Sequence, residues 1–157
     1  MNAFNVYLLI FFLKYLPGSI FENTLCFGVS DFIAFCMVGL LTKRMKIVNV
    51  LMIAYTLSTT GLVMFLFFSS NLALVPVFVC LLRVGAQMAF NTGYVSVPRL
   101  FPTKFQSTVY AITNFFAHVV ACLGPMVAEI PTPVPFISLL VGVLIALIAI
   151  RVLRELE

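Results

Sequence analysis

The sequence predicts an all-α fold, a bundle of about six helices that lie in a membrane. Of its 157 residues, 63% are hydrophobic and only 9% are charged, and the mean hydropathy is +1.19. A soluble domain of this size cannot hide so much apolar surface from water. The lipid bilayer is therefore the expected surroundings, and residues 1–157 are interpreted as a single transmembrane domain.

Short polar or proline-containing breaks separate the predicted helices. A helix needs about 20 mostly apolar residues to cross a bilayer, and short connections make neighbouring helices antiparallel. The predicted helices cover 3–13, 20–41, 47–68, 72–97, 106–128 and 136–152. The segment 3–13 is too short to cross alone, so it is either re-entrant or the last part of a helix that begins before Met1.

The basic residues predict the orientation, because Lys and Arg in loops favour the cytosolic side. Seven fall at alternate breaks and at the carboxyl end, and Lys14 alone falls on the other side. The seven are Lys43, Arg44, Lys46, Arg99, Lys104, Arg151 and Arg154. With six helices, both termini are expected in the cytosol, in a multi-pass protein of the plasma membrane.

Other function classes find little support. The formal charge of +4 comes with no basic run longer than Lys43-Arg44, so no nucleic-acid partner is expected. Neither a nucleotide-binding nor a hydrolase motif is present, so neither an enzymatic activity nor a cofactor is expected. Four cysteines without C-x-x-C spacing and a single histidine predict no metal site.

Polar side chains recur at helical spacing in two neighbouring segments. Segment 72–97 carries Arg83, Gln87, Asn91 and Tyr94, and segment 106–128 carries Ser107, Tyr110, Asn114 and His118. Each set lies on one helix face. Because polar groups are costly in hydrocarbon, the two stripes predict a shared aqueous path for a solute. The alternative is that these groups hydrogen-bond helices to one another.

Arg83 and Asp31 lie deep in their predicted helices. An arginine far from the interface needs an anion, a carboxylate or water, so both residues are candidates for the solute path. An ion pair between them would instead satisfy both charges without a solute. In the predicted helix over 106–128, Gly124-Pro125 permits a bend that helps helices rock around a cavity, or a static kink near the helix end.

Several stretches resemble organic-ion transporters of the major facilitator superfamily. Residues 89–95, A-F-N-T-G-Y-V, and the following L-F-P-T at 100–103 are similar to the tenth helix and its cytosolic loop in that family. Arg83 matches a basic position that commonly precedes this stretch. Residues 18–23 and Asp31 are similar to the eighth helix of the family. Three pairs are similar to its eleventh helix, namely Ser107-Thr108, Ala117-His118 and Gly124-Pro125.

The resemblance implies that the chain is the carboxyl-terminal half of a twelve-helix secondary transporter. Such a protein moves a small organic solute or ion by alternating access between two six-helix halves, sometimes with a proton or another coupling ion. The missing amino-terminal half is then an expected partner. His118 falls at the position that relates to substrate charge in the family, so we expect a pH-sensitive contact for substrate or coupling proton there.

The chain departs from the family in its loops. Lys43 stands where the family has an acidic residue, before Arg44; Arg99 replaces a glutamate and Gln106 an arginine. These loops normally use opposite charges to hold one conformation, so Lys43, Arg44 and Arg99 are candidates for an altered conformational latch. The departures leave an alternative open, a non-transporting membrane subunit or a degenerate transporter fragment.

Overall fold

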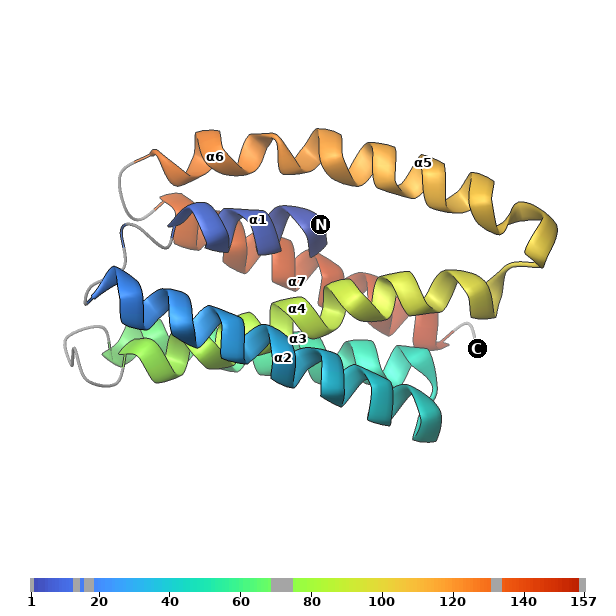
Figure 1. Cartoon of the computed structure of the whole chain (residues 1–157), viewed down its shortest axis with the longest axis horizontal. Helices are drawn as coiled ribbons and strands as arrows, with labels where there is room; N and C mark the ends of the chain where they lie inside the picture. Colours follow the sequence, from blue (N-terminus) through green and yellow to red (C-terminus); the bar gives the residue numbers. More distant parts are fainter. Residues whose placement is uncertain (1, 13–14, 16–18, 69–74, 131–133, 156–157) are drawn as a thin grey trace.

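The computed structural model describes residues 2–12, 15, 19–68, 75–130 and 134–155. These residues form an all-α bundle, which confirms the predicted fold class (Figure 1). Its helices are α1 (Asn2–Phe12), α2 (Ile20–Arg44), α3 (Ile47–Phe68), α4 (Val75–Leu100), α5 (Thr103–Ala121), α6 (Leu123–Ala128) and α7 (Val134–Glu155).

Four stretches of helix are long and apolar enough to cross a membrane. They are α2, α3, α4 and the combined stretch Thr103–Ala128, and the described residues also contain shorter apolar helices at Asn2–Phe11 and Ile137–Val152. The 11 residues of α1 rise about 16 Å, roughly half of the hydrocarbon thickness. Accordingly, α1 begins partway along the bundle in Figure 1. Membrane helices are thus supported, whereas six full crossings stay a prediction.

The predicted helix over 106–128 begins earlier and divides in two. It starts at Thr103 and is interrupted at Cys122, between α5 and α6. Pro125 has no N–H to donate to the carbonyl of Ala121, and its ring crowds that carbonyl, so the helical ladder breaks one turn before the proline. The predicted start of the preceding helix, at 72, lies outside the described residues.

α4 lies at the centre of the bundle, in contact with α1, α2, α3 and α5. Its side chains belong to two buried apolar clusters, which also receive residues from α2, α3 and α7. α5 differs, because Ala121 is its single buried residue and large apolar side chains such as Phe115 and Phe116 remain exposed on it. The bundle therefore has a closely packed centre and a loosely packed fifth helix.

α3 and α4 cross in backbone contact at two glycines. A Cβ added at Gly85 would lie 2.4 Å from the backbone nitrogen of Ser58, and one at Gly61 would lie 2.5 Å from that of Leu82. Small residues allow membrane helices to approach this closely and to gain van der Waals contact. The crossing therefore depends on the absence of side chains at Gly61 and Gly85.

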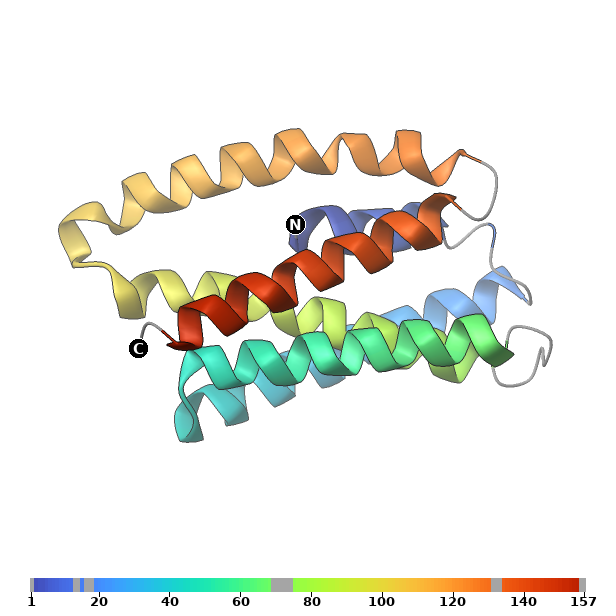
Figure 2. The same ribbon diagram turned by 180° about the vertical axis from the view of Figure 1, so that it is seen from behind.

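One end of the bundle collects the basic side chains. Figures 1 and 2 show the ends of α2, α4 and α7 and the starts of α3 and α5 at this end. Its exposed cations are Lys43, Arg44, Lys46, Arg99, Lys104 and Arg151. Lys14 and the side chain of Arg154 lie outside the described part, and the cytosolic placement of either terminus stays a prediction.

Gly85→Ala should destabilise the bundle by about 1–3 kcal/mol, the usual cost of overpacking, because its methyl group meets the α3 backbone. Gly28→Ala is the matched control, since a Cβ there has nothing within 4 Å and alanine favours a helix. Denaturant unfolding of both variants in lipid nanodiscs measures the difference. Equal midpoints for the two variants would contradict the tight crossing.

Candidate solute cavity between α1, α4 and α5

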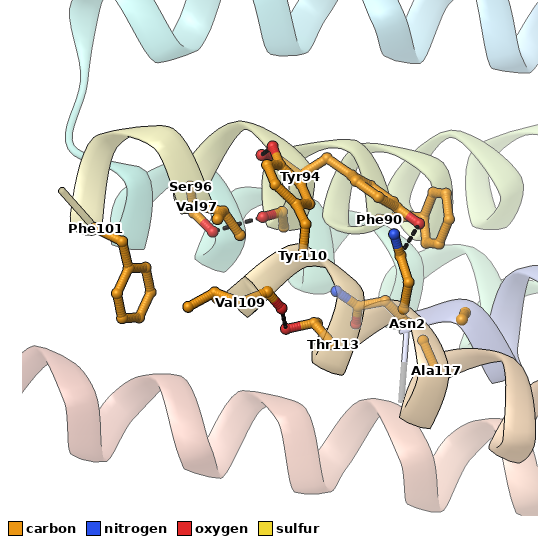
Figure 3. Close-up of a pocket in the computed structure, with 13 residues that line it drawn as sticks. Asn2, Phe90, Tyr94, Ser96, Val97, Phe101, Val109, Tyr110, Thr113 and Ala117 are labelled. Atoms are coloured by element: carbon orange, nitrogen blue, oxygen red, sulfur yellow. Dashed lines mark hydrogen bonds between the residues drawn. The ribbon is translucent and has the colours of Figure 1, made fainter. Parts of the chain in front are cut away.

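A cavity of about 450 Å³ lies between α1, α4 and α5 (Figure 3). Its aromatic wall consists of Phe90, Tyr94, Phe101 and Tyr110. The polar lining residues are Asn2, Ser96, Thr113 and Asn114. The volume is within the range of roughly 300–1,000 Å³ that is usual for small-molecule sites, and the mixture of rings with a few polar groups is also typical.

Two hydrogen bonds join the wall contributed by α4 to that contributed by α5. The Tyr94 hydroxyl donates to Asn114 Oδ1 at 2.7 Å, and the Tyr110 hydroxyl donates to the backbone carbonyl of Tyr94. That carbonyl lacks its regular helical donor, because the residue four positions later is Pro98. The proline in α4 thus creates an acceptor inside the cavity wall, and Tyr110 satisfies it.

At the corner between α4 and α5, a side chain again satisfies a carbonyl that a proline leaves without a donor. Pro102 cannot donate to the carbonyl of Pro98, and the Gln106 side-chain amide donates to that carbonyl at 3.2 Å and to the carbonyl of Phe101 at 3.0 Å. Gln106 therefore caps the carboxyl end of α4.

Arg99 connects the carboxyl ends of α4 and α2. Its Nη1 donates to the carbonyl of Thr42 at 2.7 Å, in the last turn of α2, where a cation also complements the helix dipole. Lys43 and Arg44 occupy the same last turn and are exposed. This end of the bundle is thus held by a bond from a cation to a backbone carbonyl.

Asn2 attaches α1 to the bundle at the edge of the cavity. Its Nδ2 donates to the carbonyl of Ala89 at 3.1 Å, and its Oδ1 accepts a hydrogen bond from the Tyr55 hydroxyl. The sequence pattern does not single out Asn2, because a single polar residue at the start of a short segment has no periodic partner. Phe90 and Phe101 are not singled out as lining residues either, since rings within an apolar helix do not stand out from packing residues.

The structure separates the residues of the two predicted polar stripes. Tyr94, Tyr110 and Asn114 line the cavity, whereas Ser107 is exposed outside the lining. Gln87 and Asn91 are buried away from the lining, with Gln87 Oε1 and Asn91 Nδ2 unpartnered. His118 is exposed beside the lining, in edge-to-face contact with the Tyr7 ring at 6.4 Å. The role of these residues in a solute path stays a prediction.

Arg83 pairs with Asp31 in the structure. Its Nε and Nη2 donate to the two carboxylate oxygens at 3.0 and 3.1 Å, and its Nη1 donates to the carbonyl of Val6 at 3.0 Å. The guanidinium carbon also lies 4.9 Å from the centre of the Phe27 ring. The Arg83 side chain is 4% exposed and that of Asp31 is 33% exposed. All guanidinium nitrogens therefore bind groups of the chain.

The helix α6 packs against α1 near Gly124. A Cβ added at Gly124 would lie 3.4 Å from the backbone nitrogen of Leu8, an ordinary van der Waals distance, and Pro125 follows directly in α6. Both α5 and α6 contact α1, on either side of the interruption at Cys122. A bend at Gly124-Pro125 that changes during a functional cycle stays a prediction. Among the described residues, no group of three or more His, Cys, Asp or Glu side chains could hold a metal ion.

Asp31→Leu should destabilise the bundle strongly, by about 3 kcal/mol, because it leaves the Arg83 charge buried without a counter-ion. The double variant Asp31→Leu/Arg83→Met removes both charges and should lose less stability than the single variant. Glu22→Gln is the control, since Glu22 is an exposed carboxylate on α2. Unfolding midpoints in nanodiscs test this, and strictly additive losses in the double variant would show that the pair is not coupled.

Comparison with known protein families and with curated protein sequences finds no match for this chain. Support for a function comes from the cavity and from the packing around it.

Proposed function

We propose that the chain carries a small organic solute or ion across a membrane by alternating access, as the carboxyl-terminal half of a major facilitator-type secondary transporter. The observation that supports this most is the cavity between α1, α4 and α5, into which Tyr94 and Asn114 project from the two polar stripes. A concave site with a few convergent polar groups inside membrane-spanning helices suits the binding of a solute.

The uneven packing of the bundle is compatible with alternating access. α3 and α4 are in backbone contact at Gly61 and Gly85, whereas only Ala121 is buried along α5. One wall of the cavity is therefore rigid and the other has few packing restraints. In alternating access whole bundles rock against each other or helices gate the site, and a loosely packed α5 at the cavity is compatible with such a gate.

The proposed partners follow from the exposed surfaces. A missing amino-terminal six-helix half would cover the open side of the cavity, and lipid would cover the outward apolar faces. A proton is a candidate coupling ion, with His118 beside the cavity as its contact. The plasma membrane is the proposed location, and both termini are proposed to lie in the cytosol.

A non-transporting membrane subunit is the second candidate. The pairing of Arg83 with Asp31 and the carbonyl of Val6 favours it, since these polar groups are occupied in holding helices together. The same holds for Arg99, which binds the carbonyl of Thr42. The two candidates differ in whether the cavity is accessible to water.

Single cysteines at Tyr94 and Asn114, in a background without the four native cysteines, should react with a membrane-impermeant thiol reagent. The cavity needs access to water if it binds a dissolved solute. A cysteine at Ser58, which is 1% exposed beneath the α3–α4 crossing, is the protected control. Labelling is measured in sealed vesicles. Protection at 94 and 114 equal to that at 58 would favour the non-transporting subunit.

Reporter fusions after Glu157 should signal from the cytosol, because the end of α7 lies among the exposed cations of α2, α4 and α5 and positive loops stay inside. A fusion within 69–71 should signal from the opposite side. A carboxyl-terminal reporter on the external side would reverse the proposed orientation.

A further inference from the structure

The rings of the cavity between α1, α4 and α5 are arranged to hold a flat solute. The Tyr94 ring meets Phe90 edge to face, with centroids 4.9 Å apart, and is stacked with Tyr110 at 6.1 Å and 20° (Figure 3). Phe101 contributes a further ring to the same wall. Aromatic solutes pack against such rings by stacked and edge-to-face contacts.

The lining residues carry no formal charge. Arg83 pairs with Asp31 outside the cavity, and Arg99 donates to the carbonyl of Thr42. His118 adjoins the lining without belonging to it. A charged solute would therefore lose part of its hydration without finding a counter-ion among the lining residues, which is costly. A cation above the rings would regain only part of that cost.

The hydrogen-bonding groups of the wall match an amide. Four hydroxyl groups of the wall already donate their hydrogens. Ser96 donates to the carbonyl of Gly93 and Thr113 to that of Val109. Tyr94 donates to Asn114, and Tyr110 donates to the carbonyl of Tyr94. Their oxygens keep lone pairs that can accept an N–H. The Asn114 amide, which uses its Oδ1 for Tyr94, has N–H groups that can donate to a carbonyl.

We infer that the cavity selects an uncharged, flat aromatic solute that bears an amide-like donor and acceptor. The inference rests on the proposed function only in treating the bound molecule as the transported solute. It departs from the charged substrates that the resemblance to organic-ion transporters implies. The reason is the lining itself, which offers rings and amide-matching polar groups but no counter-ion.

Three isosteric probes separate the charge classes: 2-naphthamide, 2-naphthoate and 2-naphthamidinium. Binding is measured by equilibrium dialysis with the full chain in zwitterionic nanodiscs, with partitioning into empty nanodiscs subtracted. The neutral amide should bind about tenfold or more tightly than either ion, a difference of about 1.4 kcal/mol. Asn114→Leu should weaken its binding, whereas Phe115→Leu, which alters an exposed ring outside the lining, should not.

Asn114→Asp provides a variant that keeps the wall intact. The carboxylate retains an oxygen that can accept from the Tyr94 hydroxyl and adds the counter-ion that the cavity lacks. The binding preference of the Asn114→Asp variant should therefore move from 2-naphthamide to 2-naphthamidinium. Asn49→Asp, in the first turn of α3 and outside the lining, is the matched control and should leave the preference unchanged.

The outcomes distinguish this inference from the proposed function. Tighter binding of either ion by the unaltered chain, lost in Asn114→Leu, would overturn the neutral class and leave the cavity as a solute site. Binding of none of the three probes would overturn the inference, while transport would still be judged by thiol access at 94 and 114. Equal binding of 2-naphthamide by the unaltered chain and Asn114→Leu would place the amide outside this cavity.

Discussion

The burial of the Arg83 charge is the constraint on which the arrangement of α1, α2 and α4 depends. A guanidinium inside a membrane bundle needs hydrogen-bond acceptors from the protein, because water is scarce in hydrocarbon. Asp31 on α2 supplies two acceptors and the carbonyl of Val6 on α1 supplies a third. The helices α1 and α2 are not in contact with each other within the described residues, so Arg83 connects both to α4, and the bond from Asn2 to Ala89 adds a second link between α1 and α4.

Prolines shape the other polar contacts, through the donors they lack. Pro98 leaves the carbonyl of Tyr94 without a helical partner and Pro102 does the same for Pro98, and side chains of α5 supply both donors. The side-chain bonds in the cavity wall and at the α4–α5 corner therefore have the same cause, a proline without an N–H donor. Arg99 and Gln106 also bind backbone carbonyls. A latch between helices can thus form without a carboxylate.

The proposed transport and the proposed solute class depend on the contrast between the tightly packed α3–α4 pair and the loosely packed α5. The α3–α4 crossing, with glycines in backbone contact, gives the cavity one rigid wall. α5 forms the other wall with few buried side chains and is joined to α4 by the Tyr94, Asn114 and Tyr110 contacts. A solute that competes for these bonds would act on the least restrained helix, which is where a binding event can change the packing most.

The all-α class follows from the amino-acid sequence alone, because long apolar runs with short breaks can cross lipid only as helices, whereas the strands of a barrel alternate apolar and polar residues. The sequence also places Tyr94 and Asn114 on polar helix faces, since polar residues at a period of 3.6 mark one face, and their part in a solute path stays a prediction. The sequence left open whether Arg83 pairs with Asp31, and its pattern did not single out Asn2, Phe90 or Phe101. These contacts depend on tertiary packing, because periodicity locates a side chain around its own helix and says nothing of the neighbour that faces it.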